Sequence, residues 1–422
     1  MTSDDYTTSI ASPLESEVRV YSRSWPTCFD RSRGSYLYSD DTEYLDFFSA
    51  AGSLNYGHND PDAIAALQTY LADGGVLQSL DMQTGARLDF LAALEECVLS
   101  PRGLSGYKII FTGPTGTNAV EAALKCARRA TGRTEVVSFF KGFHGVTLGS
   151  LAATSNSSKR DGAGVPLLNA TRFPFDEPGV EPDLSLDWFE RVHLKNRREQ
   201  DLPACVLMEL IQGEGGINVA RSSWANGVAD LCQRYSVPLI VDEIQTGCGR
   251  TGPFFAFENY GFIPDIIPVS KSLSGLGLPL SIVLVKQNLD LVVPGEHNGT
   301  FRGSNSSFVT SAVCLRKFWS DRRLEISTAE LSANLLQTLR DRGVSERFDV
   351  KGAGLIYGVD VGNGATADAV IRSCFEQGLL VESSGYQGEV IKIMPPLIIE
   401  TGELQRGLDI LSEALLSQGD KQ

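Results

Sequence analysis

Residues 237–272 read VPLIVDEIQTGCGRTGPFFAFENYGFIPDIIPVSKS, and this stretch decides the expected fold. It contains two short apolar runs, Pro238–Val241 and Asp265–Val269, and each run is followed by polar side chains. Such runs are typical of strands that are buried in a parallel sheet. Ligands of open parallel sheets bind beyond the carboxyl ends of the strands, so we expect Asp242 and Lys271 to lie at one binding edge.

Similar apolar runs occur on both sides of this stretch and alternate with helical patterns. The additional predicted strands are Tyr107–Phe111, Glu135–Phe139, Ala204–Met208 and Ser281–Val285, and the predicted helices are Asn118–Ala130 and Ser223–Tyr235. Strands that alternate with helices indicate an α/β protein with a mostly parallel sheet.

The two ends of the chain show other patterns. Residues 34–48 alternate like an antiparallel meander with a turn at Ser39–Thr42. After Phe308 we predict a long helix over residues 311–342, short strands near 351–361 and 389–393, and helices at 366–377 and 401–417. We therefore expect residues 60–310 to form a large domain, and residues 1–59 and 311–422 to form a smaller α+β domain together.

Composition excludes several classes of protein. The 422 residues carry a formal net charge of −15, a surface that repels nucleic acids and anionic membranes. No apolar run approaches the length of about 18 residues that a membrane span needs. Residues 1–12 have no export signal and are expected to form a poorly ordered tail. The eight cysteines lack paired spacing, which indicates free thiols and a cytoplasmic location, and no Cys/His cluster predicts a metal site.

Three features suggest chemistry at the expected edge. Residues 113–118 form a Gly-Pro-Thr-Gly-Thr-Asn turn before a helix, where Gly116 and Thr117 could bind a phosphate or simply form a tight turn and cap. No lysine follows as in a nucleotide P-loop. Asp242 could bind a metal, cap a loop or pair with a protonated ring nitrogen. Lys271 could be a surface lysine or a nucleophile that forms a Schiff base. Together the three features match the needs of pyridoxal 5′-phosphate (PLP).

Several motifs resemble those of the class III (subgroup II, ω-type) aminotransferases. They are TGTNAVEAALK (115–125), FHGVTLGSL (143–151), ELIQGEGG (209–216), VDEIQTGCGRTG (241–252) and EHNGTFRGS (296–304). The resemblance implies the fold-type I architecture of the aspartate aminotransferases, PLP as the cofactor, and a homodimer or dimer of dimers with sites at the interface.

The resemblance also implies roles for individual residues. Lys271 would hold the cofactor and Asp242 its ring nitrogen, and both would be catalytic. The other implied cofactor contacts are Gly116 and Thr117 at the phosphate, Phe143 and His144 at the ring, Gln245 near the ring hydroxyl, and Thr300, which would reach the partner subunit's cofactor. Asn55, Glu209, Glu214 and Lys392 would face the substrate.

Within this family, the chain is similar to the diaminobutyrate–2-oxoglutarate aminotransferases. The matches include LESEVRVYSRSWP (14–26), AGSLNYGHNDP (51–61) and SSGYQGEVIK (383–392). Val146 stands where enzymes for ornithine, acetylornithine or 4-aminobutyrate typically have an arginine. Lys392 replaces an arginine that holds the carboxylate of 2-oxoglutarate; it could retain that contact or be a solvated lysine at a strand end.

The resemblance implies that the terminal amino group moves between L-2,4-diaminobutanoate and 2-oxoglutarate, giving L-aspartate 4-semialdehyde and L-glutamate. This reaction would be the first committed step of ectoine synthesis, or would serve a siderophore or diaminopropane route. The alternatives are a transaminase for another ω-amine, a PLP-dependent aminomutase or racemase, and a PLP-binding domain without turnover. His58 and His297 are expected to cap turns or to bond within the core.

Overall fold

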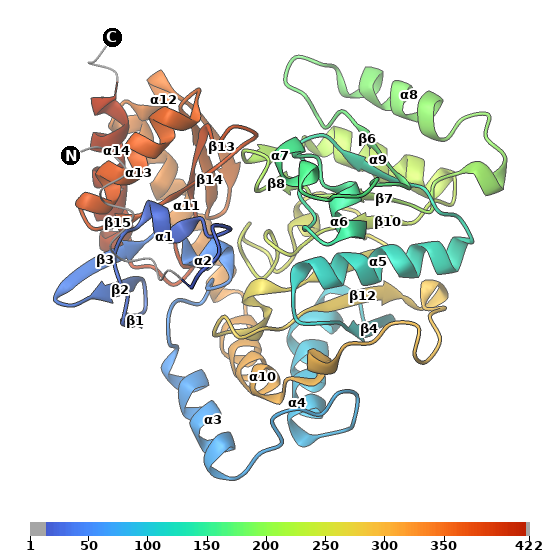
Figure 1. The fold of residues 1–422 in the computed structure, drawn as a ribbon, viewed down its shortest axis with the longest axis horizontal. Coiled ribbons are helices and arrows are strands. Elements are labelled where there is room, and N and C mark those ends of the chain that lie inside the picture. Colours follow the sequence, from blue (N-terminus) through green and yellow to red (C-terminus); the bar gives the residue numbers. More distant parts are fainter. Residues whose placement is uncertain (1–13, 419–422) are drawn as a thin grey trace.

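A computed structural model describes residues 14–418, so the tail expected at residues 1–12 lies outside the described residues. The largest element is a seven-stranded sheet (Figure 1). Its strands, in spatial order, are β4 (Tyr107–Phe111), β12 (Ile282–Lys286), β11 (Ile266–Val269), β10 (Leu239–Val241), β7 (Cys205–Met208), β5 (Val136–Phe139) and β6 (Ala170–Phe173). All are parallel except β12, which runs antiparallel to both of its neighbours.

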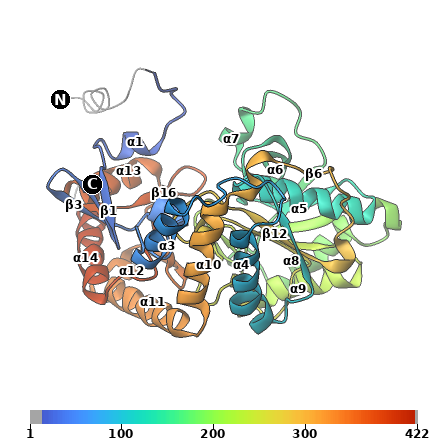
Figure 2. The same cartoon turned by 90° about the horizontal axis from the view of Figure 1, so that it is seen from below.

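Alternation along each strand places its side chains on both faces of the sheet. Cys205 and Ile240 pack with the buried face of α5 (Gly116–Thr131). Val206 and Met208 lie on the other face, in a cluster with Phe189 of α8 (Pro182–His193) and Trp224 of α9 (Ser222–Arg234). Helices therefore cover both faces (Figures 1 and 2), which explains why the strand sequences are continuously apolar.

Two smaller sheets lie beside the large one (Figure 1). In the first, strands from both ends of the chain pair: β1 (Arg31–Arg33), β2 (Tyr36–Ser39), β3 (Thr42–Asp46) and β15 (Leu379–Leu380). The second is antiparallel and consists of β13 (Asp349–Ala353), β14 (Ile356–Asp360), β17 (Val390–Ile393) and β16 (Glu382–Ser384). The hairpin β8 (Ile211–Gln212)–β9 (Asn218–Val219) contacts β13 and so links the second sheet to the large one.

The single helix predicted over residues 311–342 is wrong, because two helices occupy this region. They are α10 (Asn305–Trp319) and α11 (Arg323–Asp341). Between them, the Asp321 carboxylate accepts the backbone N–H of Arg323 at 2.9 Å, which forms a local turn just before α11. The break lets α10 pack against α3 (Pro61–Ala72) and α4 (Gly85–Leu94), while α11 packs against α14 (Thr401–Ser417).

The remaining helices are short or peripheral. They are α1 (Tyr21–Ser24), α2 (Ser49–Gly52), α6 (Leu148–Ala153), α7 (Ser157–Asp161), α12 (Val344–Arg347) and α13 (Gly364–Glu376). Within residues 14–418, no helix combines the length and apolarity that crossing a membrane requires. All eight cysteines are free thiols, and only Cys28 is exposed.

Candidate functional site

The carboxyl edge of the large sheet gathers the residues that the sequence singles out. Asp242 follows β10 and Lys271 follows β11, and these strands are parallel neighbours. Glu209 follows β7. Burial lowers the pKa of Lys271, and the Asp242 charge is among those that oppose this effect across the edge. The structure therefore brings the predicted carboxylate and amine into one site.

Lys271 is held in an uncommon backbone conformation. Its φ is +50°, in the left-handed region, and its Nζ donates to the carbonyl oxygen of Ala51 at 2.7 Å. Burial lowers the pKa of Lys271 to about 8, against the opposing charge of Glu214. A neutral amine is therefore accessible near physiological pH, as a nucleophilic or proton-accepting lysine requires.

The carboxylate of Asp242 is buried at the site and is hydrogen-bonded to His144. The side chain is buried, and Oδ2 lies 2.9 Å from Nδ1 of His144. Burial alone would lower the pKa of His144, but the hydrogen bond and charge of Asp242 outweigh burial and raise it. His144 therefore lies against the carboxylate of Asp242 as a hydrogen-bond partner. Asp242 can therefore pair with a protonated ring nitrogen.

Glu209 supports the loop that carries Phe143. One Glu209 oxygen accepts the backbone N–H of Phe143 at 2.9 Å, and the other accepts that of Gly213 at 3.2 Å. Burial raises the pKa of Glu209 to about 7. Phe143 is half-buried, and Nζ of Lys159 lies 5.5 Å from its ring centroid. Stacking by Phe143 and a substrate contact by Glu209 stay predictions.

The start of α5 follows the glycine turn that is predicted to bind a phosphate. Thr115 caps the helix by accepting from the N–H of Asn118, and the Thr117 hydroxyl lies 2.7 Å from that of Thr147 and 2.6 Å from that of Ser150. A Cβ at Gly145 would come within 2.3 Å of Thr117 Oγ1, so only glycine permits this approach. These hydroxyls lie at the positive end of the helix dipole, but Thr147 Oγ1 also donates to the carboxylate of Glu121 at 2.6 Å. Phosphate binding by Gly116 and Thr117 stays a prediction. Thr147 and Ser150 lie in FHGVTLGS but were not singled out from the sequence.

An unsatisfied polar atom points to a missing ligand. The Gln245 side chain is buried; its Nε2 donates to Ala51 O at 3.2 Å and to Glu214 at 3.3 Å. Its Oε1 is buried and has no hydrogen-bond partner within the described part of the chain. Buried acceptors are rarely left unpaired, so this oxygen suits a ligand hydroxyl. An amine, a carboxylate, a phosphate turn and this free acceptor together fit PLP.

A buried ion triad lies beside Lys271. The Lys392 side chain has no exposed surface, and its Nζ lies 2.6 Å from Glu214 and 2.9 Å from Glu382. Burial alone would raise the pKa of Glu214, but the ammonium groups of Lys392 and Lys271 lower it to about 2. Lys392 is therefore not the solvated lysine considered above. Both carboxylates are bound to its ammonium group, so a substrate could contact Lys392 only if the Glu214 side chain moved away.

Glu382 is a member of this triad that the sequence did not single out. It is buried at the start of β16, opposite Lys392 on β17, and the hydroxyl of Tyr21 donates to it at 3.3 Å. Tyr21 lies within the stretch 14–26, and Glu382 directly precedes the stretch 383–392; both stretches carry the resemblance. Neither stretch has a spacing that would predict the contact.

The predicted substrate contact of the Asn55 side chain is wrong. Asn55 is only 1% exposed, its Oδ1 accepts from Arg250 at 2.6 Å, and its Nδ2 donates to the carbonyl of Cys248 at 2.9 Å. Arg250 is fully buried and also donates to two backbone carbonyls. Asn55 therefore satisfies a buried guanidinium and has no oxygen directed at a substrate.

Thr300 lies on the surface, at the start of a turn over Thr300–Gly303. The preceding Gly299 packs against Gly113 of the phosphate turn, where an added Cβ would lie 3.4 Å from the backbone nitrogen. Thr300 is thus at the rim of the site, and its contact with the cofactor of a second subunit stays a prediction.

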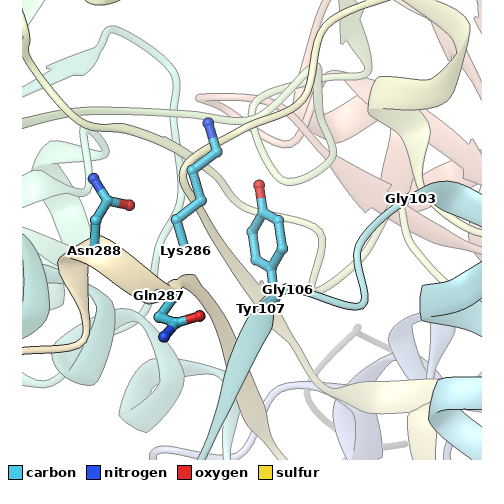
Figure 3. A pocket seen from close by; sticks show the side chains of 6 residues that line it. All are labelled: Gly103, Gly106, Tyr107, Lys286, Gln287 and Asn288. Carbon is cyan, nitrogen blue, oxygen red and sulfur yellow. The ribbon is translucent and has the colours of Figure 1, made fainter.

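A hollow of about 600 Å³ lies at the other end of the strands, where β4 begins and the antiparallel β12 ends (Figure 3). Tyr107 and Lys286 point to the same side there, and Lys286 pairs with Asp265 at 2.7 Å. It contains none of the groups described above. Among residues 14–418, no group of three His, Cys, Asp or Glu side chains is arranged to hold a metal ion.

Comparison with known proteins identifies the family. The family model for class III aminotransferases matches residues 18–415. Diaminobutyrate–2-oxoglutarate transaminase from Streptomyces avermitilis is 48% identical over 414 residues, which cover 96% of this chain and 97% of that protein. The protein of the same name from Halomonas elongata is 46% identical, with 96% and 97% covered.

Solved structures share the fold at lower identity. Ornithine aminotransferase from Toxoplasma gondii is 24% identical with a TM-score of 0.83, and covers 100% of this chain and 97% of its own. An aminotransferase from Bacillus anthracis is 24% identical with a TM-score of 0.85, and 98% of each chain is covered. The fold is that of the fold-type I PLP enzymes. The chain belongs to the class III aminotransferases, an enzyme family whose cofactor is pyridoxal 5′-phosphate.

Proposed function

We propose that this chain is a diaminobutyrate–2-oxoglutarate transaminase, which transfers the terminal amino group of L-2,4-diaminobutanoate to 2-oxoglutarate, or the reverse. The observation that carries this proposal is identity of 46–48% along nearly the whole chain with transaminases of that name. The identity extends beyond the sheet edge that family members share. The matched region covers 96% of the chain. The backbone of residues 49–56 lies against Lys271.

The residues at the sheet edge suit this chemistry. PLP, when bound, supplies an aldehyde for the amine and a ring that withdraws electrons from the reacting carbon. Lys271, with a pKa of about 8, would hold the aldehyde and then accept the proton from the terminal carbon of the substrate at Nζ. Asp242, backed by His144, would keep the ring nitrogen protonated. Gln245 Oε1 would accept a hydrogen bond from the ring hydroxyl.

Glu214 would meet the substrate beyond the reacting carbon, and Lys392 would act through its ion pair with Glu214. Glu214 is partly exposed and interacts electrostatically with Lys271, whereas Lys392 and Glu382 are buried behind it. Glu214 keeps its negative charge, because the ammonium groups of Lys392 and Lys271 outweigh burial and lower its pKa to about 2, whereas burial raises the pKa of Glu382. A negative group at this place favours a substrate that carries a second ammonium, as diaminobutanoate does.

The proposal includes a homodimer, or a dimer of dimers, in which Thr300 reaches the partner's cofactor. The turn that carries Thr300 pairs with the segment around Ser79, whose N–H donates to the carbonyl of Gly303 at 3.0 Å. Large exposed apolar side chains gather on these two segments, and patches of this kind mark interfaces. They are Val76, Leu77, Leu80, Met82 and Phe301. A cytoplasmic location and a place in ectoine synthesis are further parts of the proposal.

A substrate panel tests the function. The purified protein with PLP, L-2,4-diaminobutanoate and 2-oxoglutarate should release one glutamate for each diaminobutanoate consumed. Ornithine and 4-aminobutanoate should react at least about tenfold more slowly in kcat/KM. Faster turnover of another ω-amine would show that this amine, and not diaminobutanoate, is the preferred donor. Conversion of one amino acid without any 2-oxo acid would favour an aminomutase or racemase.

A further inference from the structure

A strained turn lies directly against the amine of Lys271. Ser49, Ala50, Ala51 and Gly52 form α2, and their φ angles are +48°, +48°, +57° and +80°. Three of these residues carry a Cβ, which makes the left-handed region unfavourable. Such strain persists only where the surrounding structure imposes it, and it gathers at functional sites.

The turn presents one carbonyl group to two residues of the site. The oxygen of Ala51 accepts from Nζ of Lys271 at 2.7 Å and from Nε2 of Gln245 at 3.2 Å. Lys271 is itself at φ +50°. The position of this carbonyl therefore fixes both the amine and the amide that is proposed to face the cofactor's hydroxyl.

A buried aspartate that is hydrogen-bonded to a histidine holds the start of the turn. Asp46 has no exposed surface, and its Oδ1 accepts the backbone N–H groups of Phe48 and Ser49, each at 2.8 Å. Its Oδ2 lies 2.7 Å from Nε2 of His58. The backbone of His58 is fixed in turn by two hydrogen bonds with Gly34. Asp46 therefore has a rigid support that depends on the His58 side chain.

The rest of the turn is attached to the site itself. The hydroxyl of Ser49 donates to the carbonyl of Met394 at 2.7 Å. The hydroxyl of Ser272, the residue after Lys271, donates to the carbonyl of Gly52 at 2.9 Å. A change at Asp46 is thus transmitted through three or four residues of strained backbone to the groups that flank Lys271.

We propose that Asp46 and His58 are positioning residues for Lys271: they hold the turn Ser49–Gly52 in its left-handed form, so that the Ala51 carbonyl receives the amine. This inference rests on the proposed role of Lys271 in the function above. Without the two N–H contacts to Asp46, the turn relaxes towards ordinary backbone angles and the carbonyl moves away.

The expected consequence is a change in the titration of Lys271. A carbonyl oxygen stabilises the ammonium form of the amine, so its loss disfavours the charged form and lowers the pKa. The other charged groups that face Lys271 lie outside the turn, and only Glu214 among them is joined to it, through the Gln245 amide. They are Glu214, Glu382, Lys392 and Asp242.

The test measures the pKa of Lys271 in the apoprotein, from the pH dependence of its acetylation by acetic anhydride, followed by peptide mass spectrometry. In the natural chain the value should be about 8. In Asp46→Ala and in His58→Leu it should fall by about 0.5 to 1 pH unit, the worth of one hydrogen bond. His58→Gln retains a donor for Asp46 and should restore the natural value.

His193→Leu is the matched control, because His193 is a buried histidine of α8 that packs against Phe173 and Phe189, away from the turn. It should leave the pKa of Lys271 unchanged. If Asp46→Ala does not fold, the His58 variants decide the matter. An unchanged pKa in His58→Leu, or an equal fall in His193→Leu, overturns the inference. Because the assay needs neither cofactor nor substrate, it can fail while the proposed transamination stands, and the reverse.

Discussion

Replacement of Lys392 by methionine should cost much of the protein's stability. The ammonium lies with no exposed surface between Glu214 and Glu382, at 2.6 and 2.9 Å. Removing one partner from a buried ion pair costs about 3–5 kcal/mol, because the remaining charge is left without compensation. The pKa of Glu214 gives a second value for the expected loss of unfolding free energy. A depression from 4.5 to about 2 corresponds to about 3 kcal/mol, of which Lys392 supplies the larger share.

The pH dependence of this loss has a defined sign. Since the folded-state pKa of Glu214 is lowered, its contribution to stability is fully present above pH 4.5 and is lost as the pH falls towards 2. The difference in unfolding free energy between the natural chain and Lys392→Met should therefore be large at pH 7. It should be smaller at pH 3.5, where the carboxylate of the variant takes up a proton.

Urea unfolding of the apoprotein, followed by circular dichroism, measures this difference. Lys286→Met is the matched control, because Lys286 also lies on a strand and pairs with a carboxylate at 2.7 Å, but its side chain is 38% exposed. An exposed pair is worth less than about 1 kcal/mol. Lys392→Arg keeps the charge and should lose less than Lys392→Met. A Lys392→Met variant no less stable than Lys286→Met would refute the reasoning about the triad.

Three further variants test the cofactor contacts. Asp242→Asn keeps the shape but removes the charge opposite the ring nitrogen, and should lower kcat by about 10²- to 10³-fold or more, measured as glutamate release, with little change in unfolding midpoint. Gln245→Leu removes the unpaired acceptor and should weaken PLP binding about tenfold, measured by fluorescence titration of the apoprotein; unchanged affinity would contradict the fit. Thr300→Ala should also weaken PLP binding by about tenfold, while an unaltered affinity in a dimer shown by ultracentrifugation would argue against its reach into the partner's site.

Much of the large sheet could be predicted from the sequence, since continuous apolar runs mark strands that are covered on both faces. The predicted strand at 107–111 matches β4 residue for residue, and the others agree within a residue or so at each end. The edge strand β6 was missed because Ala-Thr-Arg-Phe is short and half polar. The two helices α10 and α11 were merged because neither glycine nor proline separates them, although Ser-Asp before Arg-Arg-Leu-Glu is a turn signal.

The site was partly predictable, because a residue that follows a parallel strand has a known edge but not a known partner. Asp242 and Lys271 could be placed together by this rule. Other features depend on contacts between segments that lie far apart in the chain. They are the hydrogen bond between Asn55 and Arg250, the ion pair between Lys392 and Glu382, and the left-handed turn beside Lys271. No local spacing encodes such contacts, so sequence patterns give no warning of them.

Peptide mapping of the holoprotein shows whether the amine of Lys271 binds the cofactor. The holoprotein is reduced with borohydride, which makes the lysine–cofactor linkage permanent, and is then digested and analysed by mass spectrometry. We expect a phosphopyridoxyl group on the peptide that contains Lys271, and neither the label nor visible absorbance in Lys271→Ala. A label on another lysine, or an active and coloured Lys271→Ala protein, would contradict it.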